Sequence, residues 1–166
     1  MKSETRNSKF KIQTSVLILG YGNPDRRDDR VGWYILEKLQ SLVPDTVRLE
    51  TLHQLEIEWA ETVKDYDLVI FVDCHISDKD DWKRVMDIEP GYEVSTVSHQ
   101  LTPADLLGLC SVLYHQVPKG ILYSVKGTNF NFGTELSKKT CKVADEVVEE
   151  IAKTIISMKH ETLNLR

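Results

Sequence analysis

Several features that define a class of protein are scarce or missing in this sequence of 166 residues. It has three cysteines, an odd number without a CxxC pair, so we expect neither a disulfide framework nor a structural zinc finger. Free thiols fit a reducing compartment, and we expect a cytoplasmic protein. The sequence also contains no internal repeat, no low-complexity segment and no HExxH motif that would fix a metal site by itself.

Long apolar runs are absent as well. No run approaches the ~18 residues that a membrane-spanning helix needs, and the amino-terminal stretch lacks the apolar core of a signal peptide, so we expect no membrane partner. The net charge is −5, from 21 Lys and Arg against 26 Asp and Glu. Because an acidic chain is a poor general binder of phosphate backbones, we expect no nucleic acid as the main partner.

The charge is unevenly distributed along the chain. Residues 1–14 are polar and carry most of their charge as Lys and Arg, whereas the remainder is acidic. We therefore expect a flexible basic tail over residues 1–14 and a single α/β domain over residues 15–166.

Short apolar runs alternate with helical patterns after the tail. The run Val16–Leu19, closed by glycines, is typical of a strand buried on both faces. Thr102, followed by Pro and by Asp105, forms a helix start close to a capping box. Further strands are expected at 46–51, 67–72, 84–88, 93–97 and 121–125, and helices at 31–42, 55–63, 103–114 and from about 137 to 155.

This alternation predicts a three-layer α/β sandwich, a twisted and mainly parallel sheet with helices on both faces. In such sheets, ligands bind beyond the carboxyl ends of the strands. The loops that follow the expected strands are therefore where functional residues are expected.

The loop after the first expected strand is rich in glycine and charge. Gly20 and Gly22 imitate the first two glycines of a dinucleotide-binding fingerprint, but Asp25 stands at the third position. Asp28 and Asp29 would also place carboxylates where a pyrophosphate meets a helix N-terminus, so a Rossmann-like nucleotide-binding domain is only an alternative. The paired acids have two interpretations: both cap the following helix, or one caps it or pairs with arginine while the other faces the ligand.

Three polar side chains follow separate expected strands: Asp29, Asp73 and His99. Two carboxylates and one imidazole suit a divalent transition metal with open positions, which can polarise a carbonyl and activate water. Cys74 has no base paired with it in the sequence and is predicted to be a small buried hydrophobe. Spacing alone leaves other candidate ligands open, namely His53, His75, His115 and His160.

Three segments together match a known pattern: 16–24 (VLILGYGNP) with Asp28-Asp29 and Gly32, 69–73 (VIFVD), and 98–103 (SHQLTP). In these segments the sequence resembles the nickel-iron hydrogenase maturation endopeptidases. The resemblance implies an enzyme that removes the C-terminal extension of a hydrogenase large-subunit precursor after nickel insertion. It also implies that the nickel arrives with the substrate, although other divalent metals can occupy the same site.

The same resemblance assigns roles to individual residues. It makes Asp29, Asp73 and His99 the expected catalytic and metal-binding residues, and it leaves the identity of the general base open. Asn23 and Asp28 are expected to support the site, Asp28 by positioning or by its charge. A non-catalytic module that checks the nickel site or docks the partner is a further alternative.

Two positions depart from the family pattern. Arg30 stands where family members commonly have glycine, so either the loop backbone differs or Arg30 contacts the substrate. Residues 52–55 (LHQL) replace a common Asp-Gly-Gly-Thr segment. They resemble the subgroup that serves cytoplasmic bidirectional or multisubunit soluble hydrogenases, which makes His53 a candidate specificity residue.

Overall fold

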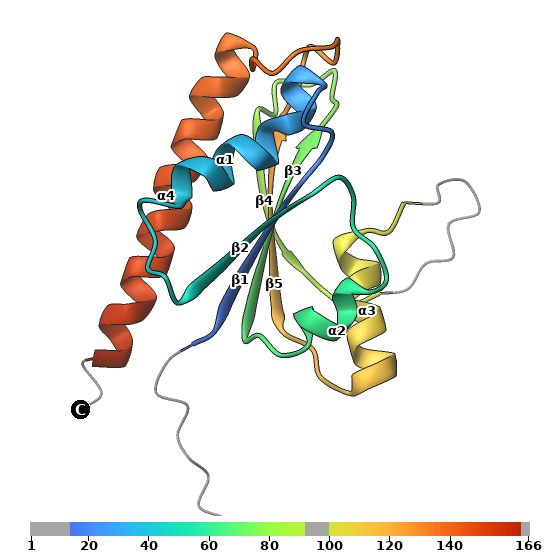
Figure 1. The fold of residues 1–166 in the computed structure, drawn as a ribbon, viewed down its shortest axis with the longest axis vertical. Coiled ribbons are helices and arrows are strands. Elements are labelled where there is room, and N and C mark those ends of the chain that lie inside the picture. The colour runs from blue at the N-terminus through green and yellow to red at the C-terminus, as the bar shows by residue number, and fades with distance from the viewer. Residues whose placement is uncertain (1–13, 92–99, 164–166) are drawn as a thin grey trace, which may run out of the picture.

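The computed structural model describes residues 14–91 and 100–163, with side chains as far as Met158. A five-stranded sheet in the order β2-β1-β3-β5-β4 forms its centre (Figure 1). The strands are β1 (Val16–Tyr21), β2 (Val47–Leu52), β3 (Leu68–His75), β4 (Lys83–Ile88) and β5 (Lys119–Lys126). All neighbouring pairs are parallel except β4 with β5, so the mainly parallel sheet expected from the sequence is confirmed.

The apolar runs form the middle of the sheet because both of its faces are covered. All six residues of β1 are buried, and so are the first five of β3. Val16 is aligned with Val47 of β2 and with Leu68 of β3. The carboxyl ends of these three strands therefore lie at one edge of the sheet, which we call the carboxyl edge.

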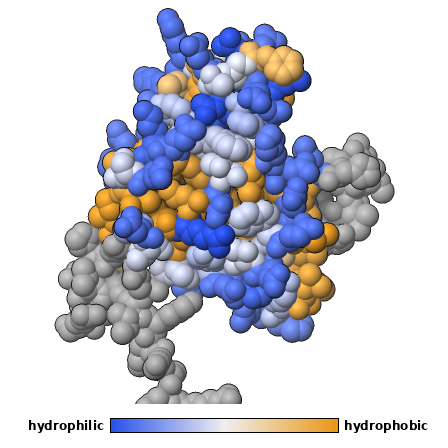
Figure 2. Space-filling view, in the orientation of Figure 1, coloured by the Kyte–Doolittle hydropathy of each residue, from blue (hydrophilic) through white to orange (hydrophobic). Residues whose placement is uncertain are grey.

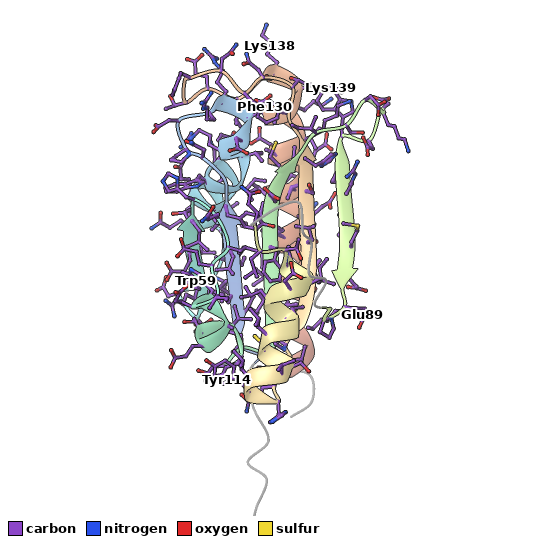
Figure 3. The ribbon with its side chains drawn as sticks, turned by 90° about the vertical axis from the view of Figure 1, so that its right-hand side faces the viewer. Trp59, Glu89, Tyr114, Phe130, Lys138 and Lys139 are labelled. Atoms are coloured by element: carbon purple, nitrogen blue, oxygen red, sulfur yellow. The ribbon has the colours of Figure 1, made fainter. Side chains whose placement is uncertain are left out.

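Two helices cover each face of the sheet. On one face, α1 (Val31–Leu39) and α4 (Lys138–Leu163) pack against side chains of the sheet such as Ile18 and Ile70. On the other face, α2 (Trp59–Val63) and α3 (Pro103–Tyr114) pack against Leu17 and Phe71. Figure 3 shows α3 alongside the sheet, with Tyr114 at the end of the molecule opposite Phe130 and Lys138. The expected three-layer arrangement is confirmed.

The expected boundaries differ from the observed ones at two helices. The first helix ends at Leu39 rather than near residue 42, because the chain turns there and leaves Leu42 about half exposed. The second begins only at Trp59. The expected strand over 93–97 and the basic tail, apart from Thr14, lie outside the described residues.

Of the helices in the described ranges, none has both the length and the apolar character needed to cross a bilayer.

The start of α3 has the local structure that the sequence predicts. Thr102 is the N-cap, its hydroxyl accepts a hydrogen bond from the Asp105 N–H at 3.2 Å, and the Asp105 carboxylate accepts one from the Thr102 N–H at 2.9 Å. This capping box satisfies two backbone donors that the first turn would otherwise leave unpaired. It fixes the position at which the chain enters α3 after the residues that carry His99.

Replacing Thr102 by Ala should destabilise the protein by about 1 kcal/mol, because the cap is lost. Urea unfolding followed by circular dichroism measures this change. Ser111→Ala is the matched control, since it removes a hydroxyl inside the same helix, where Ala is favoured. Equal destabilisation by both substitutions would contradict the capping role.

Candidate functional site at the carboxyl edge

The loop after β1 holds Asp29 against the end of that strand. Gly22 has φ +136°, and a Cβ at this position would collide with the Asp29 carbonyl oxygen. Only glycine therefore allows the loop to fold back so closely. The Asn23 N–H donates a hydrogen bond of 2.8 Å to Oδ2 of Asp29, which fixes the carboxylate over the carboxyl edge.

Asp73 reaches the same edge from β3. It follows Val72, which is aligned with Gly20 of β1, so the side chains of Tyr21 and Asp73 lie next to each other on one face of the sheet. The Cys74 N–H donates to Oδ1 of Asp73 at 2.6 Å, and Tyr21 lies beside the same carboxylate. The backbone N–H of Cys74 therefore orients Asp73.

The two carboxylates interact electrostatically. Burial raises the pKa of Asp73 and so does the negative charge of Asp29, whereas the hydrogen bond from the Cys74 N–H and the neighbouring Tyr21 hydroxyl lower it. The net result is a pKa of about 7. A cation between the two acids would remove this repulsion. The structure thus brings together Asp29 and Asp73, as expected from their positions after neighbouring parallel strands.

His99, the third expected ligand, lies outside the described residues. In the part of the chain that the structure describes, no group of three His, Cys, Asp or Glu side chains is placed to hold a metal ion. Asp29 and Asp73 offer two oxygen ligands, a donor set that fits a divalent cation taking its remaining ligands from other groups.

Asp28 has a different role from its neighbour. Its side chain is fully buried and accepts hydrogen bonds from the backbone N–H groups of Thr128, Asn129 and Ser137 at 2.7–2.9 Å. The hydroxyl of Ser137 also donates to it at 2.8 Å. Burial alone would raise the pKa of Asp28, but these hydrogen bonds outweigh it and hold the pKa below its usual range. Asp28 therefore ties the loop of residues 127–137 and the start of α4 to the loop after β1.

The interpretation of the paired acids as caps of the following helix is wrong. Arg30 is the N-cap residue of α1, and no side-chain hydrogen bond caps this helix within the described chain. Asp28 turns instead toward the start of α4, where a carboxylate also interacts favourably with the helix dipole.

Two further expected site residues shape the loop. The side-chain oxygen of Asn23 accepts a hydrogen bond from the Asp25 N–H at 3.0 Å and closes a tight turn. The guanidinium group of Arg30 donates to the Thr134 carbonyl at 3.2 Å and forms an ion pair of 2.9 Å with Glu37. Arg30 thus joins the two loops at the rim of the carboxyl edge.

His53 lies beside the same loop. Its ring packs edge-on against Trp33, with the ring centroids 5.9 Å apart. The Trp33 Nε1–H donates to the carbonyls of Gly22 and Leu52, at 3.0 and 3.1 Å. The exposed imidazole of His53 is therefore held close to the Gly22 turn, on the side of β2.

The other histidines in the described residues are not placed as ligands beside Asp29 and Asp73. Nε2 of His75 lies 2.9 Å from the Asp81 carbonyl oxygen. A carbonyl oxygen only accepts hydrogen bonds, so Nε2 must carry the proton. In the neutral ring Nδ1 then accepts a hydrogen bond from the Ser124 hydroxyl at 2.8 Å. Burial lowers the pKa of His75 and favours this neutral form. His115 ends α3 at the opposite edge, and the side chain of His160 lies outside the described residues.

Cys74 is half-buried on the face covered by α1 and α4. Its Sγ lies where a Cβ on Gly127 would have to fit, so the chain packs tightly around the sulfur. Burial raises the pKa of the Cys74 thiol, and the charges of Asp73 and Asp29 raise it further. The group therefore stays a thiol at neutral pH, which agrees with a packing role rather than a nucleophilic one.

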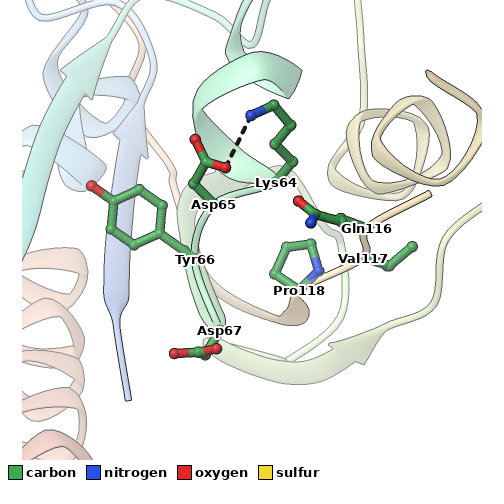
Figure 4. Close-up of a pocket in the computed structure, with 7 residues that line it drawn as sticks. All are labelled: Lys64, Asp65, Tyr66, Asp67, Gln116, Val117 and Pro118. Carbon is green, nitrogen blue, oxygen red and sulfur yellow. Dashed lines mark hydrogen bonds and ion pairs between the residues drawn. The ribbon is translucent and has the colours of Figure 1, made fainter. Parts of the chain in front are cut away.

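A pocket of about 420 Å³ opens at the other edge of the sheet (Figure 4). It lies where β3 and β5 begin, between residues 64–67 and residues 116–118. One of its acids, Asp65, is paired with Lys64 at 2.9 Å. Because ligands of parallel α/β sheets bind at the carboxyl ends of the strands, the pair of Asp29 and Asp73 is the better candidate site even though this pocket lies elsewhere.

Two contributors to the site were not expected from the sequence. Tyr21 lies beside the Asp73 carboxylate, and Ser137 with its neighbours donates hydrogen bonds to Asp28. The position of Tyr21 could have been predicted from the sequence, because a tyrosine at the end of one strand and an aspartate at the end of the adjacent strand lie on the same face of the sheet. For Asp28 no such prediction was possible, since its partners lie about a hundred residues along the chain.

Asp28→Ala should cost about 3 kcal/mol or more of the free energy of unfolding, because several buried donors lose their acceptor. Asp29→Ala should cost about 1 kcal/mol or less, since one hydrogen bond is lost while the repulsion with Asp73 is relieved. Urea denaturation of the two variants measures the contrast. Similar losses would contradict the division of roles between the adjacent acids.

The raised pKa of Asp73 predicts a pH-dependent stability. An unfolded aspartate titrates near 3.9, so the favourable contribution of protonated Asp73 is full below about pH 4 and is lost as the pH rises to about 7. Asp73→Asn removes this loss. The free energy of unfolding of the variant minus that of the natural chain should therefore rise between pH 4 and pH 8, by up to about 4 kcal/mol. A difference that is independent of pH would contradict the burial of this carboxyl group.

Solved structures of known proteins share this fold. The hydrogenase maturating endopeptidase HybD from E. coli superposes with a TM-score of 0.70 at 22% sequence identity, covering 86% of this chain and 92% of HybD. The NiFe hydrogenase maturation protease HycI from Thermococcus kodakarensis KOD1 gives 0.68 at 23% identity, covering 88% and 95%. The T. kodakarensis protease HybD gives 0.61 at 19% identity, covering 84% and 98%.

No protein-family model and no curated protein sequence matches the chain. At these identities the structural likeness establishes the fold. The chain therefore has the α/β fold of the hydrogenase maturation proteases, with its acidic pair at the carboxyl edge of the sheet.

Proposed function

We propose that the chain is an endopeptidase that removes the C-terminal extension of a nickel-iron hydrogenase large-subunit precursor after nickel insertion. The observation that carries the proposal is the convergence of Asp29 and Asp73 at the carboxyl edge, in a fold shared with hydrogenase maturation proteases. His99, which follows in the same sequence pattern, is the proposed third ligand. The reaction is placed in the cytoplasm, where free thiols such as Cys110 persist.

The substrate brings the nickel ion in this proposal. Asp29 and Asp73 are each oriented by a backbone N–H, so their remaining oxygen lone pairs are available to a cation without rearrangement of the loops. Nickel bound to the precursor would polarise the scissile carbonyl for attack by water. Asp28 supports the site through the loop that it anchors, and its own carboxylate is fully used by its partners.

His53 and Arg30 are the proposed contacts for partner selection. Both lie at the rim of the carboxyl edge, His53 beside the Gly22 turn and Arg30 between the two loops. The described residues form one α/β domain around a single sheet, without a second domain that could form a substrate cleft. Much of the specificity is therefore assigned to the precursor itself, and the subgroup of soluble or bidirectional hydrogenases is the proposed source.

The reaction is tested with a nickel-loaded large-subunit precursor. Mass spectrometry should show the loss of a C-terminal peptide with the natural chain. Asp29→Asn and His99→Ala should reduce the rate of processing by at least about a hundredfold, since each removes one proposed ligand. His115→Asn is the matched control, because this residue lies at the opposite edge and Asn tolerates its positive φ.

The outcomes separate the alternatives. A stable complex with the precursor that is never cleaved would favour a non-catalytic checking module. A melting temperature raised by ATP, NAD or FAD would favour a nucleotide-binding domain. Unchanged processing by His99→Ala would remove that residue from the site.

A further inference from the structure

Phe132 is an exposed aromatic residue at the rim of the candidate site. It lies in the loop of residues 127–137, which follows β5 at the carboxyl edge, and it is 75% exposed. Among the large apolar residues that the structure describes, only Ile76, in the loop after β3, is more exposed. Figure 2 shows an apolar group surrounded by hydrophilic residues at the end of the molecule where α4 begins. Aromatic side chains in such positions are typical of surfaces that a partner covers.

The backbone on both sides of Phe132 is anchored. The Arg27 N–H donates to the Gly133 carbonyl at 2.8 Å, and the Gly133 N–H donates to the Asp25 carbonyl at 3.0 Å. Phe130, two residues earlier in the same loop, is half-buried. Phe132 is therefore exposed on a loop that holds it in a fixed position, so a partner would meet its ring without having to order the loop first.

The two loops adopt unusual backbone conformations where they meet. Arg27 has φ +40°, a value that residues other than glycine rarely adopt, and Gly133 beside it has φ +141°. A Cβ at position 133 would lie only 3.1 Å from Nε of Arg27, so the glycine leaves room for the guanidinium group. Strained conformations of this kind concentrate at functional sites, including those that hold ligands. Here they keep the residues before Arg27 and before Gly133 next to each other.

These neighbours, Arg26 and Phe132, form a cation–π pair. The guanidinium carbon of Arg26 lies 4.3 Å from the centroid of the Phe132 ring. Nη1 of Arg26 donates to the Phe130 carbonyl at 3.4 Å, and among the described residues no carboxylate forms an ion pair with Arg26. A guanidinium group that stacks on a ring keeps N–H donors at its edge. The pair therefore presents positive charge and an apolar ring side by side.

A peptide segment in which a carboxylate stands next to an apolar side chain fits this pair. The carboxylate can accept two parallel hydrogen bonds from the guanidinium group, and the apolar side chain can cover the open part of the ring. A nucleic acid fits less well, because the carboxylates of Asp29 and Asp73 at the same edge would repel its phosphates. An acidic peptide carries fewer charges and can direct them toward Arg26.

We propose that Arg26 and Phe132 form a docking surface for an acidic segment of the hydrogenase large-subunit precursor, in which an apolar residue neighbours an Asp or Glu. The inference rests on the proposed function in that it takes the precursor as the partner. It adds a contact that binds the substrate protein away from the metal and that compensates for the negative charge of the candidate site.

Phe132→Ala and Arg26→Gln test the surface in the full-length chain. With the nickel-loaded precursor, Phe132→Ala should raise the KM of processing about tenfold and Arg26→Gln about fivefold, with kcat unchanged, because each removes a contact made equally before and during the reaction. If no cleavage occurs, biolayer interferometry should show the same changes in Kd. Phe132→Tyr keeps the ring and should retain the natural affinity.

Two matched controls lie away from the carboxyl edge. Arg48 in β2 also lies over an aromatic ring, that of Trp59, at 5.9 Å from its centroid, but it is paired with Glu50 at 2.7 Å. Val112 in α3 is 70% exposed. Arg48→Gln and Val112→Ala should leave the KM or Kd unchanged, and losses equal to those of the test variants would overturn the docking surface.

Hydrogen exchange of the precursor in the complex locates the segment that docks. The protected segment should contain an Asp or Glu beside an apolar residue. Changing that acid to Lys should weaken binding to the natural chain, and Arg26→Glu should restore part of the affinity. A protected segment without an acidic residue would overturn the proposal.

The outcomes also separate this inference from the proposed function. Cleavage with an unchanged KM in both variants overturns the docking surface and leaves the endopeptidase function standing. Binding that both variants weaken, without any cleavage, supports the surface and overturns that function. The docking surface is also overturned if the precursor does not bind the natural chain, if Phe132→Ala instead abolishes a dimer of the chain, or if Arg26→Gln abolishes binding of a DNA oligonucleotide.

Discussion

The buried carboxylate of Asp28 is the interaction on which the candidate site depends. It accepts hydrogen bonds from the loop of residues 127–137 and from the start of α4, and so joins segments that are distant in sequence. Because Asp29 is the next residue, the same anchor determines where the second carboxylate can lie. The adjacent acids thus divide two tasks: one holds the loops together, and the other remains partly accessible at the carboxyl edge.

The pair of Asp29 and Asp73 at the carboxyl edge destabilises the folded protein when both carboxylates are ionised. Burial of Asp73 next to the charge of Asp29 disfavours the ionised carboxylate, which is why its pKa reaches about 7. The chain tolerates this because the apolar sheet beneath is well packed and because the hydrogen bond from the Cys74 N–H partly compensates. Such unfavourable groups concentrate where a ligand supplies the missing interaction.

Sequence patterns predicted the elements that depend on local chemistry. The buried strands follow from uninterrupted apolar runs such as that of β3, and the start of α3 follows from the capping box at Thr102. The meeting of Asp29 and Asp73 was also predictable, because parallel strands end at one edge. The partners of Asp28 were not, since nothing near position 28 indicates that Thr128 and Ser137 fold back to it.

The long reach of the Asp28 contacts also affects the order of events during synthesis. Asp28 and Asp29 leave the ribosome early, but the partners of Asp28 follow 100 to 112 residues later. At about 5–20 residues per second, roughly 5–20 seconds pass before those donors exist. Until then a nascent chain carries exposed acids without the loop that orders them. Ordering of Asp28 and Asp29 at the carboxyl edge is therefore a late step that requires α4. A chain truncated before α4 would contain both aspartates but would have no ordered site.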